Sequence, residues 1–385
     1  MSLSEVIQLF ESRQTIQLSD RHAESIENLC RVYKKNNTVF YYNNIQELSH
    51  LFGLIQNSLI NEKVEIVQPF ISLLSLCCLG FKKVVSSDEF NHVPNLPLFF
   101  NSLCPFLRCD KFNKDKIDAN LIISKTCQVI TEFASFGVDE IKQEADEEHK
   151  SSGTALTLIK LYSEGTKNLR ALYESNVPET LVEVLAACNR IDDYMESIIE
   201  ALSHTSLYRP ISLKYAKMGM LKDLVQIIAE AKDFRSYVVL ISIDAIWNVV
   251  EVGGAEIQEA LEIEEVSVCL KKTFRRVLSE SYKLDDKCLR NELCILINYV
   301  VSAKKSHVFF TAKDNDKDFS FIELLISYAV HDELLMLSKE SHNEKFFFTS
   351  KEEDSEFKRL LWTCILHLIK NKEARDIQKI IVDVN

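Results

Sequence analysis

The chain has 385 residues, of which 46% are apolar and 26% charged, proportions typical of a folded protein and not of a disordered one. Only 8 glycines and 6 prolines interrupt it, too few for the turns of a β-rich protein of this length, so an all-α fold is predicted. The formal net charge of −12 argues against a nucleic-acid-binding protein and against electrostatic docking on anionic membranes.

The 11 cysteines are scattered through apolar segments. The opening "MSLSEVIQLF" has neither the basic start nor the apolar core of a secretory signal, so we expect free, buried thiols in a reducing compartment. Cys104 and Cys109 could form half of a zinc site, but no second Cys or His pair follows in register, and no metal is predicted. No uninterrupted apolar run reaches about 18 residues, so no transmembrane helix is expected, and residues 70–81 are predicted to form a core helix.

In chain order, residues 1–137 contain helices with apolar periodicity but no clean repeat in the first 110 residues. We expect this N-terminal region to stack on the array that follows it; the alternative is that the first 110 residues form a separate helical cap. Residues 119–137 resemble the last helix of a repeat unit. Residues 138–153 are rich in charge and are predicted to form an acidic inserted loop.

A repeat becomes visible in the middle of the chain. Leu224 lies 43 positions after Leu181 in a similar amphipathic segment, and Leu270 continues the series 46 positions later. Each segment is followed by a more apolar helix, and short helices precede the first two. Three helices in about 43 residues is the period of armadillo units. The more apolar helices are expected at residues 192–206, 236–254 and 287–303.

Residues 154–385 are therefore predicted to form armadillo-like repeats, with charged insertions near residues 312–320 and 339–356 and a late third helix at 356–371. The predicted fold is an all-α, armadillo/HEAT-like, right-handed superhelical solenoid with charged loop insertions. The alternative is that these buried helices belong to an ordinary helical bundle without repeats.

The helix at residues 242–254 is apolar almost all round and ends at two glycines. In a stacked array, such a helix is covered by its own unit and by both neighbouring units. We expect Trp247 to be sandwiched between layers. Only Asp244, Asn248 and Glu251 are left to face solvent on the concave side.

Alignment of the third helices places polar residues at matching positions, which predicts a strip that grips an extended peptide segment. A neutral or basic segment is favoured because the strip is mildly acidic. The alternative is that the strip has no binding role and is polar only because it faces solvent. The predicted strip comprises Glu200, His204, Asp244, Asn248, Glu251, Asn298 and His367, with Ser135 as an earlier member.

A second, weaker candidate is a basic patch. Lys272 and Arg276 are four positions apart on one helix, so they share a face. A partner-binding role is one interpretation of this patch, and an ordinary solvated surface is the other.

No enzyme is predicted. The sequence has no G-x-x-x-x-G-K-[ST] phosphate loop, no G-x-G-x-x-G fingerprint after a strand and no G-x-S-x-G elbow. No set of residues combines the roles that catalysis needs. No cofactor is predicted either.

Several packing segments together resemble the N-terminal part of the cilia- and flagella-associated protein 69 family. The resemblance covers most of the chain and is clearest from about residue 166 to residue 371. Family members are longer, which implies that further chain or a partner covers the last repeat. The segments are "LSEVIQLFES" from Leu3, "AKMGMLKDLVQII" from Ala216, "DAIWNVVE" from Asp244, "DDKCLRNELCILINYVV" from Asp285 and "EDSEFKRLLWTCILHLIKN" from Glu353.

The resemblance implies a non-catalytic scaffold in the axoneme of motile cilia and flagella, within the C1b projection of the central-pair apparatus. The implied partners are other central-apparatus proteins, bound through extended segments or helices, with no nucleic acid or membrane; direct microtubule contact is not favoured by the charge. The implied location is the cytoplasm and cytoskeleton, in the cilium. The alternative is a soluble armadillo adaptor for cargo peptides. Peptide-binding importers carry Trp-x-x-x-Asn, whereas Glu251 stands at the Asn place here, which disfavours nuclear import.

Overall fold

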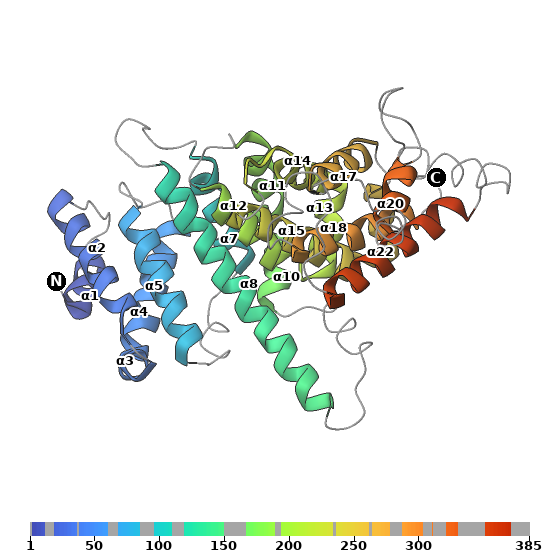
Figure 1. Ribbon diagram of the computed structural model, residues 1–385. Coiled ribbons are helices and arrows are strands. Elements are labelled where there is room, and N and C mark those ends of the chain that lie inside the picture. The colour runs from blue at the N-terminus through green and yellow to red at the C-terminus, as the bar shows by residue number, and fades with distance from the viewer. Residues whose placement is uncertain are drawn as a thin grey trace. The chain divides into compact units, whose positions relative to one another are not determined.

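The computed structural model describes most of the chain, and every element assigned in the described part is a helix, with no strand there (Figure 1). This confirms the predicted all-α class. The chain divides into two compact units, Met1–Met218 with Glu251–Gly253, and Gly219–Val250 with Gly254–Asn385. The described residues are 2–11, 19–36, 38–60, 68–84, 96–109, 119–149, 167–188, 194–233, 236–261, 264–277, 287–302, 310, 321–329 and 351–370.

The first unit contains two series of helices that stack layer upon layer. One series packs in the order α1, α4, α7, α11, and the other in the order α2, α5, α8, α12 (Figure 1). The helices are α1 (Leu3–Glu11), α2 (Asp20–Lys34), α3 (Thr38–Asn43), α4 (Ile45–Ile60), α5 (Gln68–Val84), α7 (Leu96–Arg108), α8 (Ala119–His149), α10 (Lys167–Glu174), α11 (Val177–Ala187), α12 (Met195–Thr205) and α13 (Arg209–Met218).

The layering begins at the first helices, where the sequence shows no clean repeat. Ser4 Oγ donates to Glu47 Oε1 at 3.5 Å across 43 positions. Ser72 Oγ donates to Glu27 Oε1 at 2.5 Å across 45 positions. These offsets match the period seen in the middle of the chain. The period is hidden in the N-terminal sequence because stacking requires only an apolar stripe on each helix, which many residue combinations provide.

Residues 70–81 lie in α5, which confirms the predicted core helix: Phe70 through Cys78 are all buried. Gly80 allows α3 to pack closely on α5, because a Cβ at this position would lie 2.8 Å from the Tyr41 ring. Tyr41 is fully buried, and its hydroxyl donates to the Tyr33 carbonyl at 2.8 Å. The buried phenol is thus paired, as the cost of burying a polar group requires.

The acidic segment at 138–153 differs from its prediction as a loop. α8 is 31 residues long and continues through His149, and Figure 1 shows it running past the ends of its neighbours. The reason is composition: residues 138–149 contain four Glu and one each of Lys, Gln and Ala, all strong helix formers, and no Gly or Pro. The high charge of the segment therefore did not imply a loop. Residues 150–153 lie outside the described part.

The second unit stacks in the same manner. α14 packs on α17, α17 on α18, and α22 on both α18 and α20. Lys222 and Glu265 are ion-paired at 3.6 Å across 43 positions, and Tyr299 Oη donates to the Gly254 carbonyl at 2.9 Å across 45 positions. The helices are α14 (Met220–Glu230), α15 (Tyr237–Gly253), η1 (Gly254–Ile257), α16 (Gln258–Leu261), α17 (Glu264–Arg276), α18 (Lys287–Val301), α20 (Phe321–Ala329) and α22 (Lys351–Ile369).

One predicted insertion is shorter than expected. α22 begins at Lys351, whereas the charged insertion was predicted to run through residue 356. The acidic residues at the start of this helix are compatible with a helix N-terminus, where negative charge is favourable. The insertion near residues 312–320 and the segment 339–350 lie outside the described residues.

α15 ends where the two glycines predict. Its last residue is Gly253, and Gly254 has φ 60°, a left-handed conformation that glycine adopts without steric cost. With η1 it is continuous for 21 residues, Tyr237–Ile257, long and apolar enough to cross a membrane by length and composition. The expectation based on uninterrupted apolar runs missed this, because the helix continues through Asp244. Since 56% of its most apolar window is buried within the protein, we treat α15 as a core helix of the array.

The prediction that Trp247 is sandwiched between layers is wrong. It is only partly buried, and the other tryptophan, Trp362, is 43% exposed. On α15, Trp247 follows Asp244 by three positions and precedes Glu251 by four. A helix that exposes both acidic residues must therefore turn Trp247 toward the same side.

Phenylalanines form the aromatic core instead. In the first unit, the Phe133 ring on α8 lies 5.2 Å from Phe100, 5.7 Å from Phe99 and 6.1 Å from Phe52, measured between ring centroids. These four side chains come from α4, α7 and α8 and are almost fully buried. The cluster therefore joins both helix series of this unit.

We predict that Phe133→Ala lowers the free energy of unfolding by about 3–5 kcal/mol, because it leaves a cavity among three rings. Leu98→Ala on α7 is the matched control: Leu98 is 47% exposed, and we expect a loss of about 1 kcal/mol or less. Urea unfolding followed by circular dichroism measures both. Equal effects of the two substitutions would contradict the core assignment.

Candidate partner-binding surface

One side of α15 carries exposed apolar side chains beside a carboxylate. Tyr237 is 51% exposed and Leu240 is 45% exposed, Asp244 is exposed, and Trp247 and Asn248 are partly buried. Their spacing puts them on one side of the helix. We call this set, Tyr237, Leu240, Asp244, Trp247 and Asn248, the α15 face. Glu251, exposed one turn later, continues in the same direction.

The α15 face differs in chemistry from the predicted polar strip. Asp244 and Glu251 are exposed as expected, whereas Asn248 is partly buried, and two aromatic rings and a leucine lie on the same side of the helix. Desolvation raises the pKa of the Asp244 carboxyl above its ordinary value, as expected beside apolar groups. The missed residues had a signal in the sequence, since Tyr237, Leu240 and Trp247 share the helical spacing of Asp244.

The prediction that Asn298 belongs to the solvent-facing strip is wrong, because the structure buries this residue. The residue is 9% exposed, and its Nδ2 donates at 3.0 Å to both the Cys294 and the Leu360 carbonyls. The bond to Leu360 joins α18 to α22. Asn298 therefore stabilises the packing between layers and does not present its amide at the surface. Helical position alone could not reveal this, because a strip at the border of two layers can face either solvent or the next helix.

The unit 1 members of the predicted strip lie at a similar border. His204 Nδ1 and Ser135 Oγ are hydrogen-bonded at 2.8 Å, which joins α12 to α8. Glu200 is partly buried on the same helix, and its charge adds to the burial that raises the pKa of the Cys127 thiol. The proposed earlier member Ser135 is thus adjacent to His204, in a contact between layers.

His367 on α22 is partly buried. One turn earlier, Thr363 Oγ1 donates to the Arg359 carbonyl at 2.9 Å. Neighbouring positions on the helix expose apolar groups, with Leu366 61% exposed. The structure therefore brings Asp244, Asn248 and Glu251 onto one helix side, places Asn298 and His204 in contacts between layers, and leaves Glu200 and His367 partly buried on α12 and α22.

The predicted basic patch lies on α17 beside α14. Lys272 is exposed. Arg276 Nη1 donates to the carbonyls of Ala229 at 3.2 Å and Ala231 at 2.6 Å, at the end of α14. Helix C-terminal carbonyls lack partners within their helix, so this contact supplies one. Arg276 consequently has a structural role as well as a charge.

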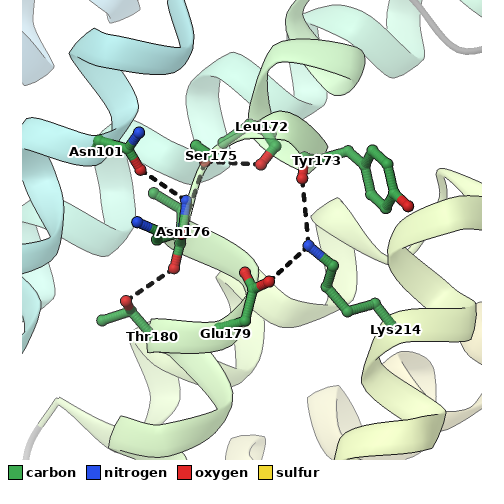
Figure 2. A network of polar contacts seen from close by, with 9 residues as sticks. Asn101, Leu172, Tyr173, Ser175, Asn176, Glu179, Thr180 and Lys214 are labelled. Carbon is green, nitrogen blue, oxygen red and sulfur yellow. Dashed lines mark hydrogen bonds and ion pairs between the residues drawn. The ribbon is translucent and has the colours of Figure 1, made fainter.

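A polar network fixes the corner between α10 and α11 (Figure 2). The Asn176 amide donates to Asn101 Oδ1 on α7 at 2.7 Å. Lys214 Nζ on α13 donates to the Tyr173 carbonyl at 3.3 Å and to Glu179 Oε1 at 2.7 Å. These contacts link four helices around one short turn, so the orientation of α11 against its neighbours is fixed.

Two parallel series of helices, joined by contacts about 43–45 positions apart, define an armadillo-type helical-repeat protein. The chain belongs to the family described as cilia- and flagella-associated protein 69, ARM repeat, whose model matches residues 1–381. It is therefore a cilium-associated armadillo-repeat protein. A comparison with curated proteins finds no match. Among the described residues, no group of three or more His, Cys, Asp or Glu could hold a metal ion.

The cysteines of the described part are free thiols, and most are buried. Of ten, only Cys188 and Cys269 are partly exposed. Burial raises the pKa of Cys30 and of Cys294 to about 12. Because the thiolate is the reactive form, the buried thiols are both inaccessible and protonated at neutral pH.

We predict that iodoacetamide at pH 8 labels Cys188 and Cys269 at least about tenfold faster than Cys30 or Cys294 in the folded chain. Mass spectrometry of the digested protein measures each site. In urea the four rates should converge, which serves as the control. Comparable rates in the folded chain would contradict the burial of Cys30 and Cys294.

We also predict a coupled effect at the α11–α13 contact. Lys214→Met should destabilise the first unit by about 1 kcal/mol, because Glu179, only 35% exposed, loses its cation. Lys214→Met with Glu179→Met should recover most of that loss, since no unpaired charge remains. Urea unfolding of the two variants and of Glu179→Met completes a double-mutant cycle. Additive effects would show that the pair contributes nothing.

Proposed function

We propose that this protein is a non-catalytic structural scaffold of the motile cilium and flagellum axoneme, a component of the C1b projection of the central-pair apparatus. Its armadillo array holds partner proteins at fixed positions. Membership of the cilia- and flagella-associated family supports the ciliary setting. The layered packing supports the scaffold role, because a repeat array presents an extended, stiff surface.

The observation that carries the proposal is the α15 face. A helix that is otherwise among the most buried in the array leaves Tyr237 51% and Leu240 45% exposed, with Trp247 partly exposed beside them. Tyrosine and tryptophan contribute a disproportionate share of binding energy at protein interfaces. This surface therefore fits a protein partner.

The chemistry of the face selects the kind of partner. Asp244 and Glu251 are exposed carboxylates at its edge, and they favour a neutral or basic segment over an acidic one. Trp247 and Leu240 offer apolar contact to a side chain of that segment. A helix or an extended strand of another central-apparatus protein, with an apolar anchor and a nearby basic residue, meets both requirements.

The scaffold function requires a rigid array, and the contacts between layers provide rigidity. Asn298 bonds α18 to α22, Ser135 and His204 bond α8 to α12, and Tyr299 bonds α18 to the end of α15. Each contact fixes the register of one helix against its equivalent in the next layer.

We predict that Trp247→Ala reduces rebinding of the purified chain to detergent-extracted axonemes that lack it by about tenfold or more, which is a typical loss at an aromatic hot spot. Trp362→Ala is the matched control, because it removes the other tryptophan, which lies on α22 and is 43% exposed. Sedimentation and immunoblotting measure rebinding. Both variants should keep the melting temperature of the unmodified chain within a few degrees. Equal rebinding of the two variants would remove the α15 face from the proposal.

A second experiment separates the scaffold from the alternative of a cargo adaptor. Detergent extraction of isolated cilia should leave a scaffold with the axoneme, whereas an adaptor that binds cargo reversibly should be released. Release of the chain together with soluble proteins, and its presence in both nucleus and cytosol, would favour the adaptor.

A further inference from the structure

A groove of about 750 Å³ lies between α14 and α17 in the second unit, separate from the α15 face. α14 and α17 run parallel, as Lys222 pairs with Glu265 near the start of the groove and Arg276 reaches Ala229 near its end. The partly exposed Ala229, Val268 and Cys269 provide an apolar floor. The remaining lining residues are Gln226, Glu230, Lys272 and Thr273.

The charged residues along the groove differ in whether they have an ion-pair partner. At the start, Lys222 is paired with Glu265. Glu230 accepts a hydrogen bond from the neutral Gln226 Nε2 at 3.0 Å and keeps its charge. The lining thus has three cations, Lys222, Lys272 and Arg276, and two carboxylates, Glu230 and Glu265. Lys272, exposed in the middle of the wall, has no ion pair or hydrogen bond within the described residues. In a chain of net charge −12, the groove combines an uncompensated cation with an apolar floor.

Arg276 completes the cationic end. Its Nη1 is held by the Ala229 and Ala231 carbonyls at 3.2 and 2.6 Å, so the guanidinium is fixed at the groove and costs little further side-chain entropy on binding. It lies four positions after Lys272, one helical turn away. The two cations therefore point in similar directions from α17.

We propose that this groove binds a short, extended acidic segment of a partner protein. Carboxylates of the segment pair with Lys272 and Arg276, and an aliphatic side chain of the segment packs on Val268 and Ala229. From Lys222 to Glu230, α14 rises about 12 Å. An extended chain advances about 3.3 Å per residue, so about four residues of the segment occupy the groove.

The two surfaces thus take partners of opposite charge. The α15 face, bordered by carboxylates, favours a neutral or basic segment, whereas the α14–α17 groove takes an acidic one. The array can then hold two different segments at once. The groove proposal does not depend on the α15 face, and each is tested by its own substitution.

The test uses the full chain and a fluorescein-labelled acidic heptapeptide with a central leucine, with a peptide carrying lysine at every acidic position as the control probe. Fluorescence anisotropy should show saturable binding of the acidic peptide alone. Raising the salt from about 50 to about 500 mM should weaken it, because exposed charges are screened. Lys272→Glu should weaken binding about tenfold or more, whereas Lys370→Glu just after α22, an equal charge change at an exposed site, should not.

A footprint locates the peptide. Cys269 lies in the groove and Cys188 lies in the first unit, and both are partly exposed. Bound acidic peptide should slow alkylation of Cys269 and leave Cys188 unchanged, and Lys272→Glu should abolish this protection. Trp247→Ala should keep both binding and protection.

Three results would overturn the proposal. They are no saturable binding at millimolar peptide, equal weakening by Lys272→Glu and Lys370→Glu, and unchanged alkylation of Cys269 in the bound state. None of them bears on rebinding to axonemes through the α15 face.

Discussion

The structure depends on one constraint: each helix buries its apolar stripe against its equivalent in the next layer. An amphipathic helix cannot cover this stripe alone, and burial of apolar surface is the main favourable contribution to folding. In the first unit this produces the series α1, α4, α7, α11 beside α2, α5, α8, α12. The Phe133 cluster joins the two series, so neither is complete without the other.

Polar contacts fix the register in which the apolar faces of neighbouring layers pack. Apolar stripes are nearly interchangeable along a helix, whereas a hydrogen bond has one length and direction. Asn298 at the α18–α22 contact and the Asn176 corner on α11 therefore fix where one layer sits on another. Several polar residues that could have bound partners serve this purpose. A surface for recognition remains where a helix side is left uncovered, as on α15 and between α14 and α17.

The sequence predicted the class of fold and the more regular part of its period, and less of the surface. Leu181, Leu224 and Leu270 revealed the repeat because their helices keep similar apolar spacing. The same period at Ser4 and Glu47 escaped notice, because stacking there uses different side chains. Asp244 and Glu251 were correctly predicted to be exposed on α15, whereas Asn248 is partly buried. Trp247 was misplaced, because tryptophan in an apolar helix was assumed to be buried.

The sequence by itself determined that the chain is helical and that its helices repeat about every 43 residues, because periodicity and composition are local properties. The ciliary family came from a resemblance of packing segments, and a match to the family model over residues 1–381 supports it. Only the tertiary structure decided which side of each helix meets another layer. That choice buried Asn298, left Tyr237 and Leu240 exposed, and placed Lys272 in a groove with the end of α14. These outcomes depend on helix rotation and on neighbours about 45 to 70 positions away, which no local pattern encodes.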